Sequence, residues 1–274
     1  VVREIESQKG YVLSEEEMAV TIGKVDEVVE IELVNYFIKG NIALTKVDED
    51  YPDNKLSGAV FEVYSDTNGD GKLDKDDTLL GEMKELDGGV YQMSELRYGK
   101  YLVKETKAPT GFVLDEDVYA VSIEENGKTY TVENKAGVGF INAAQKGSLK
   151  IVKTSSDGKV EGFSFRVTGV DYDQTFKTDK NGEIVIEGLR IGDYTVSEVS
   201  DKASAGYILP ADKQATVKVN ATAIVQMHNE FRDTPKTGDD FNLGLWVSLA
   251  ALSVVGAGVL GFVGYKNRKK KKED

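Results

Sequence analysis

Two segments of this chain repeat one pattern of residues, and the repeat limits the fold more than any other feature. NYFIKGNIALTK (35–46) and NAAQKGSLKIVK (142–153) both begin with Asn, contain Lys-Gly, and place a Lys eleven residues after the Asn. VREIESQKGYVL (2–13) matches VKETKAPTGFVL (103–114), and YTVSEVSDKASAGYIL (194–209) matches both with two extra residues. Such self-similarity indicates tandem copies of one structural unit.

The residues between these segments have the pattern of short β-strands. Tyr, Val, Ile, Thr and Phe alternate with charged residues, and Gly, Asn and Asp interrupt the runs. We therefore expect an all-β chain of tandem, immunoglobulin-like antiparallel β-sandwiches. They would comprise an incomplete repeat (1–38) from an upstream domain, a first full repeat (39–145) and a second full repeat (146–231). Because the chain enters this pattern midway, without Met or a signal peptide, we expect a longer protein.

The composition excludes several classes of protein. The chain has 274 residues and a net charge of −13, although its last nine residues, KNRKKKKED, carry six basic groups. An acidic chain lacks the basic face that nucleic-acid binding needs, so we expect no nucleic-acid partner. There are no cysteines, which excludes disulfide bonds and thiolate metal sites.

Each full repeat directs a lysine, a glutamate and an asparagine towards its own core. Side chains two residues apart on a strand share a face, so Lys153 lies on the same face as Leu149 and Ile151. The same rule, applied to each expected strand, gives two clusters: Lys46, Glu105 and Asn142 in the first repeat, and Lys153, Glu198 and Asn229 in the second. The incomplete repeat contributes Glu4 and Asn35.

A buried ammonium without a partner is very unfavourable, so these clusters need an explanation. The strand can end there and leave its lysine in water, or the three groups can form a buried hydrogen-bond network. The third alternative is a covalent bond. In apolar surroundings Lys and Glu both shift towards their neutral forms, a neutral amine is a nucleophile, and a protonated Glu polarises the Asn carbonyl. The product is a neutral amide, and ammonia leaves.

One of these strands also carries a family signature. YLVKETKAPTGF (101–112) resembles the E-box of the Cna protein B-type domains, also called SpaA-like or prealbumin-like domains, of Gram-positive pilins and adhesins. The resemblance covers nearly all of residues 1–231 and implies a prealbumin-like sandwich. Two departures are present: Gln8 stands where the motif has proline, and SEVSDKASAGY (197–207) lacks that proline and is longer.

The resemblance assigns roles to the clustered residues. It implies isopeptide bonds between Lys46 and Asn142 and between Lys153 and Asn229. Glu105 and Glu198 would be the catalytic residues of these two reactions. Glu4 and Asn35 would belong to an upstream domain whose lysine precedes residue 1.

A loop in the first repeat has the spacing of a calcium site. DTNGDGKLDKDD (66–77) fits a twelve-residue EF-hand loop with Gly71 at its sharp turn. The expected ligands are Asp66, Asn68, Asp70, Lys72 through its carbonyl oxygen, Asp74 and Asp77. Because the flanking residues have the pattern of strands, we expect one structural Ca²⁺ that stiffens the loop. We do not expect a hinge-type calcium sensor. An acidic surface turn is the alternative.

The C-terminal part of the chain has the organisation of a membrane anchor. Residues 243–265 contain no charge and, as a helix, would span about 34 Å, enough to cross a bilayer. The basic tail (266–274) predicts a cytoplasmic C-terminus by the positive-inside rule. We therefore expect a single transmembrane helix, with residues 1–242 outside the membrane; a buried core helix is the alternative.

The segment before this helix (232–242) resembles an LPXTG cell-wall sorting signal. The motif residues are Thr234, Pro235, Lys236, Thr237 and Gly238, with Thr234 in place of Leu. Sortase would cut between Thr237 and Gly238 and join the chain to an amine of peptidoglycan or of a pilin. A plain single-pass anchor is the alternative.

Together these features predict a cell-wall-anchored surface stalk, either a pilin subunit or an adhesin. Its partners would be sortase, peptidoglycan or a pilin amine, and other pilin subunits or a host surface ligand. We expect no enzyme activity beyond the autocatalytic formation of the isopeptide bonds. The competing interpretation is the spacer and anchor of a surface-attached enzyme whose catalytic domain lies upstream.

Overall fold

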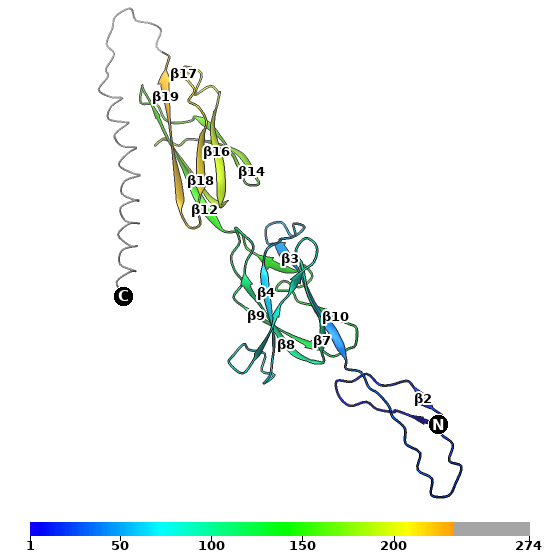
Figure 1. Ribbon diagram of the computed structural model, residues 1–274. Helices are drawn as coiled ribbons and strands as arrows, with labels where there is room; N and C mark the ends of the chain where they lie inside the picture. Colours follow the sequence, from blue (N-terminus) through cyan, green and yellow to red (C-terminus); the bar gives the residue numbers. More distant parts are fainter. Residues whose placement is uncertain (233–274) are drawn as a thin grey trace, which may run out of the picture.

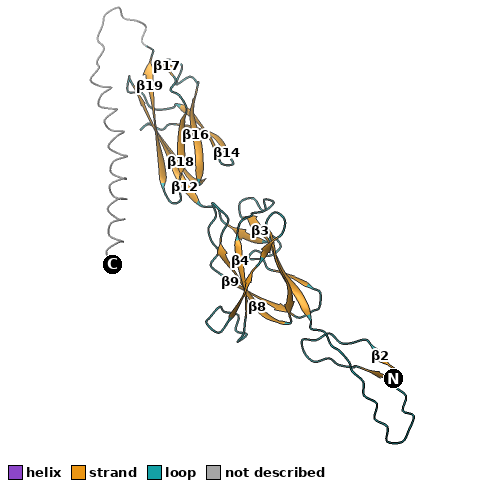
Figure 2. Ribbon diagram, in the orientation of Figure 1, coloured by secondary structure: helices purple, strands orange, loops and turns teal. Residues whose placement is uncertain are grey.

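The computed structural model describes residues 1–232, and every regular element in this part of the chain is a β-strand (Figure 2). The all-β prediction is confirmed. The incomplete, first and second repeats follow one another end to end as an elongated rod (Figure 1). In the described residues no helix is long and apolar enough to cross a membrane. The sorting motif, Thr234 to Gly238, and the expected transmembrane helix lie outside the described residues.

The first repeat is a sandwich of two sheets. One sheet has the order β10-β3-β7-β6 with β11 also paired to β3, and the other has the order β5-β4-β8-β9. Ile42, Phe61, Tyr91 and Phe140 are almost fully buried between the sheets. The strands are β3 (Lys39–Asp48), β4 (Val60–Ser65), β5 (Thr78–Glu82), β6 (Lys84–Glu85), β7 (Val90–Arg97), β8 (Gly99–Lys107), β9 (Val118–Ile123), β10 (Thr129–Thr131) and β11 (Phe140–Asn142).

The second repeat is built in the same way. Its sheets have the orders β15-β12-β19-β17 and β14-β13-β16-β18. Leu149, Phe165, Val196 and Met227 are fully buried between them. The strands are β12 (Lys146–Ser155), β13 (Ser164–Gly169), β14 (Tyr172–Lys177), β15 (Glu183–Arg190), β16 (Gly192–Val199), β17 (Tyr207–Ile208), β18 (Lys213–Val217) and β19 (Thr222–Phe231).

The first and last strands of each repeat lie side by side and run in the same direction. β3 pairs in parallel with β10 and β11, and β12 pairs in parallel with β19. The antiparallel expectation holds for the other pairs but is wrong for these. The alternation of side chains specifies which face is buried and not which strand lies next to it. Each repeat therefore begins at one end of its sandwich and finishes at the other.

The repeated Lys-Gly pair has a steric origin. The register of β3 shifts just after Gly40, and that of β12 shifts just after Gly147. A Cβ atom would lie 2.8 Å from the Lys128 carbonyl oxygen at the first glycine and 2.2 Å from the Lys218 carbonyl oxygen at the second. Only glycine permits this close approach of two backbones.

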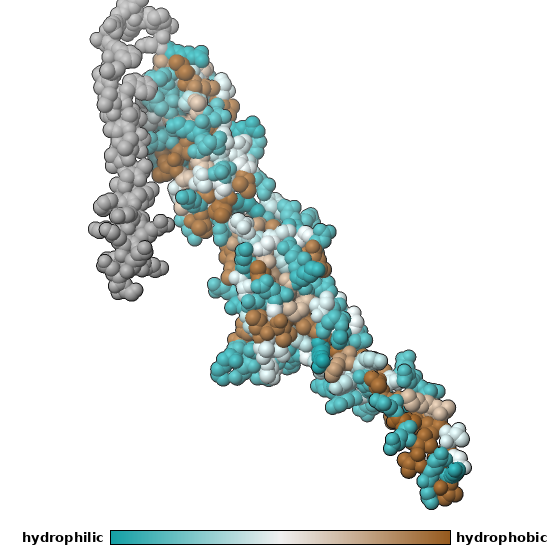
Figure 3. All heavy atoms as spheres, viewed as in Figure 1, coloured by the Kyte–Doolittle hydropathy of each residue, from teal (hydrophilic) through white to brown (hydrophobic). Residues whose placement is uncertain are grey.

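The incomplete repeat contains one short ladder, β1 (Val2–Arg3) with β2 (Glu17–Met18). Its apolar side chains are unusually exposed, and Val25 is 91% exposed. Figure 3 shows the corresponding apolar surface near the N-terminal end of the rod. Within residues 1–232, no second sheet covers these side chains.

Candidate functional site: two buried clusters of lysine, glutamate and asparagine

The lysine and the asparagine of each cluster come from the parallel strand pair. In the first repeat Phe140 is opposite Lys46, and Asn142 is opposite Asp48. In the second repeat Met227 is opposite Lys153, and Asn229 is opposite Ser155. The asparagine is thus always opposite the residue two positions beyond the lysine, so both side chains point to the same face.

The glutamate comes from the facing sheet. Glu105 on β8 is opposite Phe61 on β4, and Glu198 on β16 is opposite Phe165 on β13. The structure buries all six polar side chains: Lys46 is 0% exposed, and Glu198, the most exposed, only 9%. Both predicted clusters therefore lie in the cores, as the alternation of side chains indicates.

In the first cluster the glutamate holds the asparagine. Asn142 Nδ2 donates to both carboxyl oxygens of Glu105, at 3.0 and 2.9 Å, and the Asp115 backbone N–H donates to Oε2 at 2.8 Å. Lys46 Nζ donates to the Phe140 carbonyl oxygen at 3.0 Å and lies 5.2 Å from the centre of that ring. Among the described residues, Asn142 Oδ1 has no hydrogen-bond partner.

The second cluster has the same glutamate–asparagine contact, but its glutamate accepts fewer hydrogen bonds. Asn229 Nδ2 donates to Glu198 Oε1 at 2.6 Å. Lys153 Nζ lies 4.3 Å from the centre of the Phe163 ring. In this part of the chain, Glu198 Oε2 and Asn229 Oδ1 both lack a partner. Buried polar atoms are nearly always paired, so unpaired carbonyl oxygens in both clusters require an explanation.

Burial shifts both kinds of ionisable group towards neutrality. Desolvation lowers the pKa of Lys46 to about 8, against the opposing effect of the Glu105, Asp115 and Asp48 carboxylates. It also lowers the pKa of Lys153 and raises the pKa of Glu105 and of Glu198. A proton that leaves the lysine for the glutamate removes both charges from the core.

The incomplete repeat holds part of a third cluster. Asn35 Nδ2 donates to Glu4 Oε1 at 2.6 Å, and the Ser14 N–H donates to Glu4 Oε2 at 2.8 Å. Both side chains are half-buried. These hydrogen bonds lower the pKa of Glu4, the opposite of the shift at Glu105. No lysine in residues 1–232 forms an ion pair with Glu4.

The expected calcium loop (66–77) lies between β4 and β5, so its flanks are strands as predicted. Its acidic side chains bind the loop's own backbone. Asp66, which is buried, accepts from the Gly69 and Gly71 N–H groups at 2.7 and 3.1 Å, and Asp77 accepts from Thr67 and Asp74. No three His, Cys, Asp or Glu side chains in the described residues are grouped to hold a metal ion. Calcium therefore stays a prediction from the spacing.

Sequence reasoning missed Asp115, which supports the first cluster. Its N–H bonds to Glu105, and its carboxylate accepts from the Tyr119 hydroxyl at 2.8 Å and from Asn134 Nδ2 at 2.7 Å. Ser14 holds Glu4 from the same offset of ten residues, and this shared spacing was the available signal.

The comparisons with known proteins agree with this architecture. Residues 40–136 and 147–231 match the family model described as SpaA, a prealbumin-like fold domain. No curated protein matches the chain.

Three solved structures illustrate the likeness. The Bacillus anthracis TIE protein is 27% identical with a TM-score of 0.63, and the match covers 84% of this chain and 41% of that one. The minor pilin of Streptococcus agalactiae is 17% identical with a TM-score of 0.32, covering 73% of this chain and 100% of that one. The shaft pilin SpaA of Lactobacillus rhamnosus GG is 14% identical with a TM-score of 0.32, covering 72% and 99%.

This chain therefore spans less than half the length of the Bacillus anthracis protein. The family model matches more than half of this chain, in two copies that fall on the two sandwiches. The resemblance to prealbumin-like domains that the E-box indicates is thus confirmed. The chain belongs to the SpaA family of prealbumin-like fold domains.

Proposed function

We propose that this chain is a load-bearing stalk on the surface of a Gram-positive cell, a pilin subunit or an adhesin, locked by internal Lys–Asn isopeptide bonds. One observation carries the proposal. A Lys, a Glu and an Asn are buried together in two repeats, with the same strand register in both. Membership of the SpaA family supports it.

The proposed reaction is an amide exchange without oxidation or reduction. The neutral Lys46 amine adds through Nζ to Cγ of Asn142, and Glu105 passes the displaced proton to Nδ2. The Cγ–Nδ2 bond then breaks, ammonia leaves, and an Nζ–Cγ amide remains. Folding holds the two reactants together, which can supply about 7–11 kcal/mol of the barrier. Lys153, Glu198 and Asn229 would react in the same way.

The unpaired asparagine oxygens fit this chemistry. The oxygen and nitrogen of an amide are assigned from their hydrogen bonds, and a protonated carboxyl group is a donor. If the side-chain amide of Asn142 is rotated by half a turn, Oδ1 takes the place of Nδ2. A protonated Glu105 then donates to Oδ1 and polarises the carbonyl that the amine attacks. Burial raises the pKa of Glu105 and so favours that protonated form.

The parallel strand pair makes the bond mechanically useful. Tension that enters at the start of β3 would pass from Lys46 to Asn142, along residues 142–153, and from Lys153 to Asn229. Residues 47–141 and 154–228 would carry no load. The sandwiches would then resist unfolding through covalent bonds instead of through ladders of hydrogen bonds.

The same proposal places the remaining segments. Residues 1–38 would complete an upstream domain of the same kind, in which Glu4 and Asn35 meet a lysine supplied from before residue 1. Sortase would cut after Thr237 and join the chain to an amine of peptidoglycan or of another pilin. One Ca²⁺ held by residues 66–77 would stiffen a long loop of the first repeat.

Single-molecule stretching of the intact chain from its two ends tests the mechanical role. We expect that neither repeat lengthens before the chain detaches from the points at which it is pulled, because the path of the force through each repeat is covalent. Replacing Glu105 and Glu198 with Gln should introduce two unfolding steps. Unfolding steps of the full repeats in the unaltered chain would contradict the proposal.

A further inference from the structure

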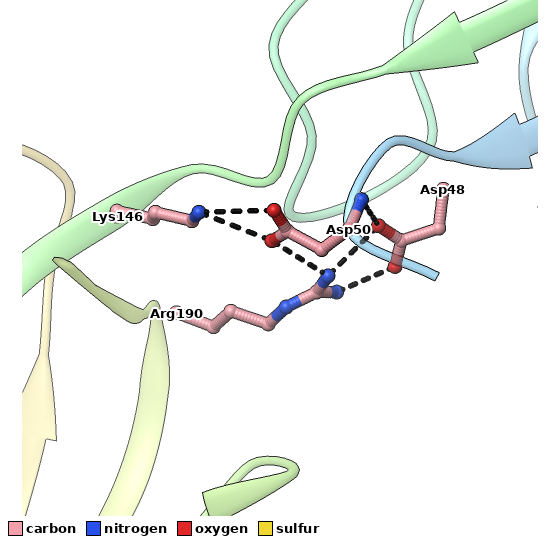
Figure 4. A network of polar contacts seen from close by, with 4 residues as sticks. All are labelled: Asp48, Asp50, Lys146 and Arg190. Carbon is pink, nitrogen blue, oxygen red and sulfur yellow. Dashed lines mark hydrogen bonds and ion pairs between the residues drawn. The ribbon is translucent and has the colours of Figure 1, made fainter. Parts of the chain in front are cut away.

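A cluster of four charged residues joins the first repeat to the second (Figure 4). Arg190 Nη1 and Nη2 donate to the two carboxyl oxygens of Asp48 at 2.7 and 2.8 Å, and Nη2 also donates to Asp50 at 3.0 Å. Lys146 Nζ lies 3.0 Å from Asp50. Asp48 is only 2% exposed, so this two-pronged contact is largely shielded from water.

The arginine is held firmly on the second repeat. Arg190 ends β15 directly opposite Lys146, the first residue of β12. Its carbonyl oxygen accepts the Tyr194 hydroxyl at 2.9 Å, and the N–H of Ile191, the next residue, donates to the Gln145 carbonyl oxygen at 3.1 Å. Its guanidinium is therefore presented to the first repeat from a fixed backbone.

The residues that the arginine binds lie at the end of β3, the strand that carries Lys46: Asp48 is its last residue, and Asp50 follows it in the bend. Asp48 lies two positions beyond Lys46 on β3 and directly opposite Asn142. Between the two bound aspartates, the Glu49 N–H donates to the Asn142 carbonyl oxygen at 3.1 Å. The Arg190 guanidinium thus binds the residues on either side of Glu49, and the Glu49 N–H fixes the Asn142 backbone.

We propose that Arg190, from the second repeat, is a positioning residue for the Lys46–Asn142 crosslink of the first repeat. The inference rests on the proposed isopeptide chemistry and adds a dependence of one repeat on the next. Arg190 acts through Asp48 in two ways. It fixes the end of β3 that lies opposite Asn142, and it offsets part of the charge of a carboxylate that stabilises the Lys46 ammonium.

The charges around Lys46 make the second effect measurable. Carboxyl groups act on it from three directions: Glu105 on β8, Asp115 in the loop before β9, and Asp48 on its own strand. Of these three carboxyl groups, only Asp48 forms an ion pair with an arginine within residues 1–232, and that arginine belongs to the other repeat. Without that partner, Asp48 should raise the pKa of Lys46 further than it already does and so reduce the fraction of neutral amine.

The second cluster supplies an internal control. The residue opposite Asn229 is Ser155, which carries no charge and hydrogen-bonds within its own turn, to Asp157 and to the Lys159 carbonyl oxygen. The Lys153–Asn229 reaction should therefore not respond to Arg190, provided that the second repeat folds.

The test follows both crosslinks separately in the full chain. Newly made chains from a cell-free system are incubated at several pH values, and peptide masses report each loss of ammonia over time. Arg190→Met should slow the first crosslink and shift its pH profile upward, about tenfold in rate for each unit by which the Lys46 pKa rises. The second crosslink should keep its rate and profile.

Two variants separate charge from shape. Arg190→Lys should restore the pH profile but only part of the rate, because an ammonium supplies charge without the two-pronged contact. Adding Asp48→Asn to Arg190→Met should also return the profile to its original position. Arg166→Met removes a similar but exposed two-pronged pair with Asp173 and should change neither crosslink.

Three results would overturn the inference. In the first, Arg166→Met slows the first crosslink as much as Arg190→Met does. In the second, Arg190→Met leaves the pH profile of the first crosslink unchanged. In the third, Arg190→Met slows both crosslinks together. The last result would mean that Arg190 serves only the folding of the second repeat. No ammonia loss in the unaltered chain would instead reject the crosslinks themselves, and so the proposed function.

Discussion

Glu105 in the first repeat and Glu4 in the incomplete repeat accept the same two kinds of hydrogen bond and respond in opposite ways. Each carboxyl group receives an asparagine side chain and a backbone N–H from ten residues further along. The pKa of Glu105 is nevertheless raised, whereas the pKa of Glu4 is lowered. Glu105 is 0% exposed, and Glu4 is only half-buried.

The difference shows which part of the cluster shifts the glutamate towards its neutral form. Hydrogen bonds to a carboxylate favour its charged form, and both glutamates accept the same kinds, Glu105 one more than Glu4. Of these two glutamates, only Glu105 has an opposing sheet and a buried lysine around it within residues 1–232. The shift of the glutamate towards its neutral form is therefore a property of the complete sandwich, and the following predictions separate burial from hydrogen bonding.

The largest effect is expected from Glu105→Gln. Glutamine fills the same space but cannot pass a proton, so the Lys46–Asn142 bond should not form. That bond closes a loop on the order of 100 residues, and its loss should lower the free energy of unfolding by about 4–5 kcal/mol by the chain-entropy model. Chemical denaturation measures the change, which should be confined to the first repeat. An unchanged transition would contradict the proposed crosslink.

The next effect is a pH dependence that only the uncrosslinked repeat should have. The unfolded Lys46 keeps its proton up to about 10.5, whereas the buried amine loses it at about 8. Between these values the unfolded state binds more protons, so stability should rise with pH, by about 3 kcal/mol or more, because Glu105→Gln also removes a carboxylate that raises the Lys46 pKa.

Denaturation of Glu105→Gln across this pH range measures that rise, and adding Lys46→Met removes it if the lysine is its source. The crosslinked chain should lack the dependence, because its amide does not titrate. A Glu105→Gln variant whose stability responds to pH in the same way as that of the double variant would show that Lys46 stays solvated.

A smaller effect should distinguish the Asp66 loop from an ordinary turn. Calcium at 100 times its dissociation constant should stabilise the first repeat by about 2.7 kcal/mol, and a chelator should remove this gain in thermal unfolding. Asp66→Asn should abolish the response. Asp179→Asn, at a turn of the second repeat where Asp179 also accepts backbone N–H groups, is the matched control. A chelator without effect would favour the acidic turn.

No crosslinking effect is expected from Glu4→Gln in this chain. The substitution removes the same chemical group as Glu105→Gln, but from a half-buried cluster that no lysine of residues 1–232 completes. The masses and stabilities of both full repeats should be unchanged. A loss of either crosslink would mean that Glu4 acts on a distant repeat, and the comparison above would fail.

The sequence predicted which face of each strand is buried better than it predicted which strands are paired. The alternation of side chains placed Lys46, Glu105 and Asn142 in one core, since period-two patterning depends only on local geometry. Their catalytic and crosslinking roles stay predictions. The parallel pairing of β3 with β11 could not be predicted, because strand order depends on contacts between distant segments. The same holds for Arg190 and Asp48, which lie 142 residues apart.

The intact mass of the chain tests the central claim most directly. Each isopeptide bond expels one ammonia, about 17 Da, because folding holds the reacting groups together. We predict a deficit of two ammonias in the unaltered chain and of one in each of Glu105→Ala and Glu198→Ala. A full mass in the unaltered chain would show that the buried clusters are hydrogen-bonded networks only, and it would contradict the covalent stalk.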